Sequence, residues 1–302
     1  MFEFTIPSAL HQDRAIPLKM TVHATGLVHP SHMEWTTDGR LLVSEFGRGR
    51  IVDITNGGDM RDAPPFAFNL LHPAAIVTTY EGSRIIVADA GADRVVDITN
   101  GGDATEAPVV FSGIPAPYGM VQFKKSLFIT YSDYSGNGLF KMEPGLEFSY
   151  DASYAGHFPS GISDHPYVLA RSGACGSWTA SVSNDRLLYC QSSFGIIYDV
   201  TAGGHFSAKE TDRRVAWGLN KPIGMIYAPK RKLLYVTESG SGNIKAISLT
   251  DPINMRYVPP VVTGLKEPRC VRFSPDEETM YVCDMSNCCI WRIDLGKVNS
   301  KD

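Results

Sequence analysis

The amino-acid sequence predicts an all-β repeat protein, and two observations support this. The octet VDITNGGD occurs twice without change, at Val52–Asp59 and at Val96–Asp103, with an offset of 44 residues. The runs around both copies are short, rich in Val, Ile, Tyr and Phe, and separated by Gly, Asp and Asn, which is typical of strands and turns. A period of this length built from short strands indicates the blades of a β-propeller.

Six blade starts can be placed along the chain, and five of them contain a proline. The starts lie near residues 29, 72, 116, 174, 221 and 267. Each start is followed by a second and a third β-rich run, and a fourth run precedes the next start. The prediction is therefore one six-bladed β-propeller domain over residues 1–302.

The last blade lacks a fourth strand, because the chain ends soon after Leu295. Near the other end, Met20–Val28 resembles the runs that precede the other blade starts, and it leads directly into the first blade. An open ring leaves two sheet edges unpaired, which favours closure. We therefore expect the N-terminal strand at residues 20–28 to complete the last blade.

Two loops interrupt this pattern. The Asn-Gly of the repeated octet favours a tight turn between a third and a fourth strand, which is a structural role. The stretch 143–173 is longer than the other connections and is rich in proline. An insertion of this size in a compact repeat is typical of a lid or a binding loop.

Composition and charge narrow the classes of partner. The formal net charge is −4, which argues against a nucleic-acid or anionic-membrane surface. No run approaches the ~18 apolar residues of a membrane span, and the first residues do not have the pattern of a signal peptide. The six cysteines form no CxxC pair, which indicates reduced thiols. The expectation is a cytoplasmic protein that acts on a small molecule, with its oligomeric state left open.

In a propeller, the end of each second strand and the start of each inner strand meet at one mouth of a central channel. The acids at the ends of second strands are Glu45, Asp89, Asp133 (or Ser132), Glu238 and Asp284. Two like charges ~6 Å apart cost roughly 3 kcal/mol at an effective dielectric near 20. A divalent cation, a raised pKa or a nearby Arg269 can relieve this repulsion. Alternatively, each acid caps the turn that follows it.

If a metal is bound, Glu45, Asp89, Glu238 and Asp284 are the predicted ligands. Carboxylate oxygens suit Ca²⁺, Mg²⁺, Mn²⁺ and Zn²⁺ about equally well, so the sequence leaves the choice among these divalent cations open.

Three further residues depart from their repeat positions. His32 stands where the sister blades have Ala75, Gly119 and Gly224, so it is a candidate catalytic base. Tyr118 and Arg269 are candidates for binding or stabilising negative charge. The alternative for Arg269 is a salt bridge to Glu267 or Asp284.

The cadence from HPSHMEWTTDGRLLVSEFGRGRIVDIT onward resembles NHL-repeat and streptogramin-lyase-type propellers. More distantly it is similar to the gluconolactonase and strictosidine-synthase-like groups. The resemblance covers residues 20–295. It implies a six-bladed propeller, with a metal at the channel mouth in the lactonase-like group and a Mg²⁺-assisted site in the lyase-like group.

The expected function is a metal-assisted hydrolase, lactonase-like, or a lyase. The metal would polarise a carbonyl or activate water, one acid or His32 would act as base, and Arg269 with Tyr118 would stabilise negative charge. One alternative is a metal-free enzyme in which a carboxylate such as Glu238 is the base, as the strictosidine-synthase resemblance implies. Another is a non-catalytic NHL-type binding module.

Overall fold

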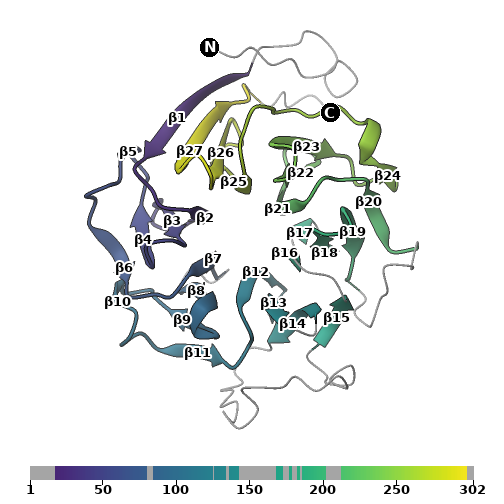
Figure 1. Ribbon diagram of the computed structural model, residues 1–302. Coiled ribbons are helices and arrows are strands. Elements are labelled where there is room, and N and C mark those ends of the chain that lie inside the picture. The colour runs from purple at the N-terminus through teal and green to yellow at the C-terminus, as the bar shows by residue number, and fades with distance from the viewer. Residues whose placement is uncertain are drawn as a thin grey trace.

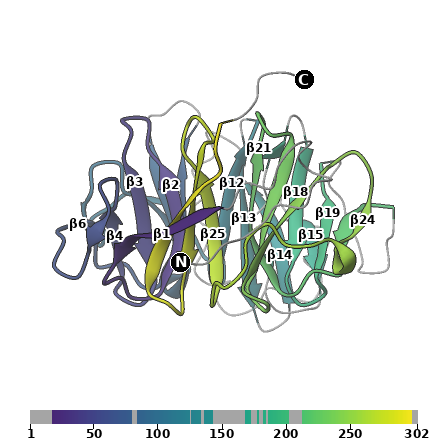
Figure 2. The same cartoon turned by 90° about the horizontal axis from the view of Figure 1, so that it is seen from above.

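The computed structural model describes residues 18–79, 84–124, 126–133, 136–142, 168–172, 177–178, 182–183, 186–201 and 212–297. In these ranges the chain forms six β-sheets that stand in a ring around a common axis (Figure 1). Seen from the side, the strands run along the thickness of the ring (Figure 2). No helix in these ranges is long and apolar enough to cross a membrane. The prediction of a six-bladed β-propeller is confirmed.

Each of the first three blades runs outward from an inner strand near the axis (Figure 1). The first blade contains β2 (Pro30–Trp35), β3 (Leu41–Glu45), β4 (Arg50–Asp53) and β6 (Pro65–Phe68). The second contains β7 (Pro73–Thr78), β8 (Ile85–Asp89), β9 (Arg94–Asp97) and β11 (Val109–Ser112). The third contains β12 (Pro117–Phe123), β13 (Ser126–Asp133), β14 (Gly136–Met142) and β15 (Val168–Ser172).

The other three blades repeat this order. The fourth contains β16 (Ser177–Trp178), β17 (Val182–Ser183), β18 (Arg186–Gln191), β19 (Ile196–Asp199) and β20 (Arg214–Trp217). The fifth contains β21 (Pro222–Ala228), β22 (Leu233–Glu238) and β23 (Asn243–Ile247), with Val262 bridged to Ile244 at its outer edge. The sixth contains β25 (Pro268–Phe273), β26 (Thr279–Asp284), β27 (Cys289–Asp294) and β1 (Lys19–Thr25).

The N-terminal strand closes the ring as predicted. Strand β1 pairs antiparallel with β27, in a register that sets Lys19 opposite Asp294 and Ala24 opposite Ile290. The sixth blade therefore combines three strands from the end of the described chain with one from its beginning, and Figure 1 shows β1 beside β27. This pairing leaves no unpaired edge on the outer side of β27, which is the physical advantage of closure.

The repeated octet links neighbouring blades. Its Gly-Asp pair forms β5 (Gly58–Asp59) in the first copy and β10 (Gly102–Asp103) in the second. Strand β5 pairs in parallel with β1 of the sixth blade, and β10 pairs in parallel with β6 of the first blade. In the fifth blade, β24 (Ile253–Asn254) pairs in the same way with β20. Each loop therefore extends the outer edge of the preceding blade.

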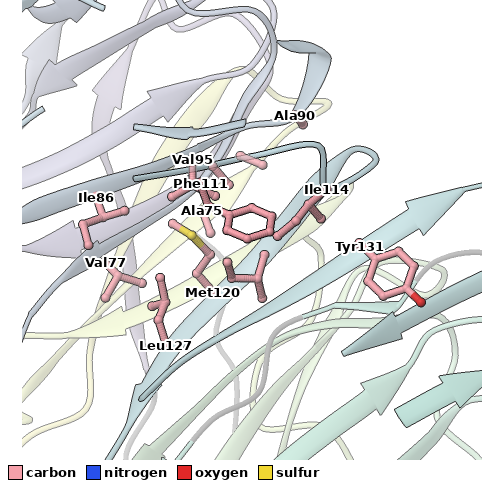
Figure 3. Packing of buried hydrophobic residues seen from close by; sticks show 13 residues of the cluster. Ala75, Val77, Ile86, Ala90, Val95, Phe111, Ile114, Met120, Leu127 and Tyr131 are labelled. Carbon is pink, nitrogen blue, oxygen red and sulfur yellow. The ribbon is translucent and has the colours of Figure 1, made fainter. Parts of the chain in front are cut away.

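The core lies between the faces of neighbouring blades. Second strands such as β3 and β8 are buried along their whole length, because both faces of these strands pack against other sheets. Strands buried on both faces have near-continuous apolar sequences rather than alternating ones. Figure 3 shows one such cluster, between the second and third blades, where Ala75, Phe111 and Met120 interdigitate.

The third blade differs from the sequence expectation at the end of its second strand, and part of the stretch that follows its third strand lies outside the described residues. In the third blade Tyr131, not Ser132 or Asp133, lies opposite the proline that opens the inner strand, so Tyr131 occupies the position of the acids in the other blades. The predicted lid at 143–173 contains β15, the fourth strand of its blade. The rest of that stretch lies outside the described residues.

The turn between β22 and β23 contains Gly242, which packs closely against the connection between the fifth and sixth blades. Gly242 has φ +67°, and a Cβ there would lie 2.0 Å from the carbonyl oxygen of Leu265. Gly39 has φ +84° with no atom within 4 Å of the corresponding position. Both Gly→Ala changes cost about 1–2 kcal/mol through the left-handed backbone. Gly242→Ala should cost a further ~1–3 kcal/mol through the clash.

Urea denaturation gives the free energy of unfolding of the wild type, Gly242→Ala and Gly39→Ala. The loss relative to the wild type should be larger for Gly242→Ala than for Gly39→Ala. Equal losses for the two variants would show that Leu265 does not approach Gly242 as closely as described.

Candidate functional site

The four acids predicted as metal ligands occupy equivalent positions in four different blades. Each ends a second strand and lies opposite the proline that opens the inner strand of the same blade. Their side chains are almost completely buried. The exposed fractions are 0% for Glu45, 0% for Asp89, 2% for Glu238 and 0% for Asp284.

Each of these carboxylates accepts hydrogen bonds from the backbone that leads into its own inner strand. The acid therefore fixes the connection between the outer edge of one blade and the inner strand of the next. The donors are Val28 N–H to Glu45 (2.7 Å), Leu71 N–H to Asp89 (2.5 Å), Asn220 N–H to Glu238 (2.8 Å), and Lys266 and Glu267 N–H to Asp284 (3.0 and 2.8 Å).

In three blades a cation from the third strand completes the charge balance. Arg50 pairs with Glu45, Arg94 with Asp89 (2.9 Å), and Lys245 with Glu238 (3.6 Å). The same cations donate to carbonyl oxygens of the following loop, at Met60, Ala104 and Met255. In the sixth blade, neutral donors from Asn287 (2.7 Å) and Trp291 (3.1 Å) take this place at Asp284.

The resulting chain of carboxylate, cation and carbonyl recurs in the first, second and fifth blades. Burial raises the pKa of Asp89 even though Arg94 and the Leu71 N–H oppose the shift. The repulsion expected among the acids is thus relieved by contacts within each blade.

These acids do not fit a divalent cation. Their oxygens already accept from N–H groups, and a positive side chain lies against three of the four. Among the residues that the structure describes, no group of three or more His, Cys, Asp or Glu side chains is arranged to hold a metal. The predicted ligand set of Glu45, Asp89, Glu238 and Asp284 is distributed over separate contacts in four blades.

Glu238 is also a candidate base. In the structure, both oxygens of its carboxylate accept hydrogen bonds from the protein. One accepts from Asn220 N–H, and the other accepts from the Ser241 hydroxyl at 3.1 Å. Lys245 lies 3.6 Å away. This carboxylate therefore fixes the connection between the fourth and fifth blades.

His32 connects three inner strands. Its Nδ1 accepts from the backbone N–H of Ile76 in β7 at 3.2 Å, and its Nε2 lies 2.9 Å from Nη2 of Arg272 in β25. Burial and the Arg272 charge hold the pKa of His32 well below its usual value. Protein nitrogens therefore lie against both ring nitrogens, and the neutral ring can accept a hydrogen bond at one of them.

Arg272 and Glu34 are the functional candidates that the sequence reasoning missed. Arg272 Nε donates to Glu34 Oε2 at 3.0 Å, and the side chains are 12% and 24% exposed. Burial raises the pKa of the Glu34 carboxyl although Arg272 opposes this. In the described part of the chain, Glu34 Oε1 has no hydrogen-bond partner. Glu34 is thus a partly buried carboxylate with one oxygen fixed and the other open.

A signal for Glu34 and Arg272 was present in the repeat. Both stand at the fifth position of an inner strand counted from its proline, where the sister blades have Val77, Val121 and Ile226. A complementary pair of charges at an otherwise apolar repeat position indicates a special role. The first and last blades become neighbours only when the ring closes, so the pairing itself requires the fold.

Arg269 and Tyr118, the remaining two candidates, make no contact with Glu34 among the interactions of the described residues. Arg269 donates to Glu267 through Nη2 at 2.5 Å and Nε at 3.0 Å, which is the alternative expected from sequence. Glu267 also accepts from the Ser286 hydroxyl. Tyr118 packs on the apolar cluster between the second and third blades.

The arrangement defines a closed β-propeller with a buried polar cluster at the junction of its first and last inner strands. Three solved structures with a similar fold are described as enzymes. A gluconolactonase from Xanthomonas campestris is similar with a TM-score of 0.66 and 10% identity, over 97% of this chain and 94% of that one. A PQQ-bound aldose sugar dehydrogenase from Streptomyces coelicolor is similar with a TM-score of 0.66 and 15% identity, over 92% of this chain and 98% of that one.

Virginiamycin B lyase from Staphylococcus aureus is also similar, with a TM-score of 0.54 and 12% identity over 92% of this chain and 99% of that one. At these identities the likeness establishes the propeller fold alone. No protein-family model matches the sequence, and no curated protein matches it.

Removal of one cation from the buried chain should destabilise the protein strongly. Arg50 is 13% exposed, and Arg50→Ala would leave the buried Glu45 with only the more distant Arg48, whose Nη1 lies 3.8 Å from Glu45 Oε1. Breaking a buried pair in this way costs about 3–5 kcal/mol. Arg84 pairs with Asp97 at 2.7 Å but is 45% exposed, so Arg84→Ala should cost about 1 kcal/mol or less.

Chemical denaturation of Arg50→Ala and Arg84→Ala at one pH and salt concentration tests this ranking. An Arg50→Ala variant as stable as Arg84→Ala would contradict the structural role of Glu45.

The lowered pKa of His32 predicts a dependence of stability on pH. Below about pH 6.5 the unfolded chain protonates this histidine while the folded chain does not, so the free energy of unfolding should fall as the pH is lowered. The slope is at most about 1.4 kcal/mol per pH unit for one group. His32→Asn should flatten the curve between pH 7.5 and pH 5.

His23→Gln is the matched variant, because burial lowers the pKa of His23 less strongly and its removal should flatten the curve less. Equal slopes for the wild type and His32→Asn, measured by urea denaturation across this range, would rule out a neutral buried His32.

Proposed function

We propose that the protein is a small-molecule enzyme, a hydrolase of lactone or ester type or a lyase, in which Glu34 is the general base. The observation that carries this proposal is the geometry of Glu34. One oxygen is fixed by Arg272, the other is open, and the side chain is 24% exposed on an inner strand. A positioned carboxylate with a raised pKa is suited to accept a proton.

The environment of Glu34 favours the acceptance of a proton. Burial raises its pKa and makes the carboxylate a stronger base than an exposed glutamate. The open Oε1 would accept a proton from a water that attacks an ester carbonyl, or from the carbon next to a carbonyl in an elimination. Both reactions need the same proton acceptor, so the proposal covers a hydrolase and a lyase.

Arg272 is a positioning residue in this proposal. Its three guanidinium nitrogens are all used within the protein, since Nε donates to Glu34, Nη1 to the Val271 carbonyl and Nη2 contacts His32. It therefore orients Glu34 and limits the rise in the pKa of that carboxyl, while His32 anchors the other end of the guanidinium. Fixed hydrogen bonds of this kind keep a catalytic side chain in one rotamer.

The fold comparison supports an enzyme without choosing the substrate. The similar structures include a gluconolactonase and a lyase by their descriptions, which makes lactones and esters the first substrates to test. The open carboxylate favours the metal-free form of the enzyme expected from sequence. Glu34, and not Glu238, takes the role of the base.

Glu34→Gln tests the base directly. The variant keeps the size of the side chain and the contact with Arg272 but cannot accept the proton, so kcat should fall by about 10²–10⁴-fold. Steady-state hydrolysis of a panel of γ- and δ-lactones and aryl esters, followed by acid release, gives the rates. The control is Glu106→Gln, an exposed glutamate whose replacement should leave kcat unchanged.

Full activity of Glu34→Gln with unaltered circular dichroism would eliminate Glu34 as base. Absence of turnover across the panel by the wild-type protein would contradict the hydrolase form. Elimination assays on the same esters would then decide the lyase form.

The pH profile separates a base from a structural carboxylate. The kcat/KM of the wild type should fall on the acid side as Glu34 becomes protonated, with a midpoint above the ordinary value of 4.5. Arg272→Gln removes a charge that lowers this pKa, so its acid limb should move to higher pH. An unmoved limb in Arg272→Gln would show that the titrating group is not Glu34.

A further inference from the structure

Two buried cysteines face each other across the inner strands of the sixth blade. Cys270 in β25 lies directly opposite Cys283 in β26, and the exposed fractions are 1% and 0%. Residues directly opposite in an antiparallel pair have Cβ atoms about 4.5–5.5 Å apart. A disulfide needs a Cβ separation of about 3.5–4.5 Å, so a small approach of the two strands suffices.

The surroundings make the two thiols unequal. Burial opposes the ionisation of Cys270, but the hydrogen bond with Cys283 and the charge of Arg272 outweigh it and lower the pKa of Cys270 to about 7. Burial, followed by the contact with Cys270, raises the pKa of Cys283 well above its usual value. One sulfur is therefore a nucleophile near neutral pH, and its partner retains its proton.

The other described cysteines that are buried lack this environment. The thiol of Cys190 in β18 contacts the carbonyl oxygens of Pro222 and Ile223 at 3.6 and 3.2 Å. Burial and the charge of Asp284 raise the pKa of Cys289 to about 12. The combination of a facing thiol and a nearby guanidinium occurs at Cys270 and Cys283.

We propose that Cys270 and Cys283 are a redox-active dithiol, which a small hydroperoxide oxidises to an intrachain disulfide. This assignment is independent of the reaction at Glu34. The charge of Arg272 acts on both thiols, and the Arg272 side chain is 12% exposed, so a partly solvated group neighbours the sulfur pair. Hydrogen peroxide is small enough for such a site.

The chemistry balances with one peroxide. The thiolate of Cys270 attacks one oxygen of the peroxide, an S–O bond forms, the O–O bond breaks, and the leaving hydroxide takes up a proton to become water. The sulfur of Cys283 then attacks the sulfenic sulfur of Cys270, the S–S bond forms, the S–O bond breaks, and a second water leaves. Two thiols are oxidised, and one peroxide is reduced to two waters.

Thiol counting on the folded protein tests the proposal. The full chain is treated with hydrogen peroxide, denatured, and titrated with a thiol reagent. The wild type should lose two of its six thiols, and dithiothreitol should restore both. Tryptic peptides should show 270–272 joined to 273–292 before reduction and separate after it.

Single variants identify the sulfurs. Cys283→Ala should abolish the link, whereas Cys289→Ala and Cys190→Ala should still lose two thiols, with circular dichroism to verify that each variant is folded. Retention of six thiols by the folded wild type, or a link that persists in Cys283→Ala, would overturn the proposal. If Cys283→Ala does not fold, Cys270→Ser provides the same comparison.

Discussion

Closure of the ring by β1 is the constraint on which the rest of the structure depends. The pairing of β1 with β27 places the first blade against the last, and so brings β2 next to β25. Arg272 reaches Glu34 across 238 positions of sequence and His32 across 240. Without this closure the guanidinium, the imidazole and the carboxylate would belong to opposite ends of an open array.

The buried acids illustrate how the propeller stabilises charge in its interior. A carboxylate removed from water is costly unless it is paired and hydrogen-bonded. At Glu45 and Asp89 the backbone supplies one donor and an arginine supplies another, and the arginine in turn donates to a carbonyl oxygen. Such a chain of contacts fixes the entry of each inner strand. The same residue type at the same repeat position is therefore a structural device of the blade.

Glu34 differs from these acids in one physical respect. The oxygens of Glu45 are occupied by Val28 N–H and Arg50, whereas Glu34 has one oxygen held by Arg272 and one open, on a side chain that water reaches. A closed carboxylate stabilises the fold, and an open one can exchange a proton. The facing thiols of Cys270 and Cys283 lie at the same junction, so both of our proposals concern the place where the ring closes.

The sequence by itself determined the architecture, because the period, the prolines that open the blades and the missing fourth strand are local patterns that repeat. It also placed the acids correctly at the ends of second strands, and it identified His32 as an exception to its repeat. It could not decide what these side chains contact, since a strand position does not reveal which donors a neighbouring blade presents.

Only the tertiary structure decided that Glu45, Asp89, Glu238 and Asp284 hold connections between blades, and that Glu34 is the open carboxylate. The physical reason is that charge pairing and burial depend on neighbours supplied by other blades, and these neighbours meet only when the ring is closed.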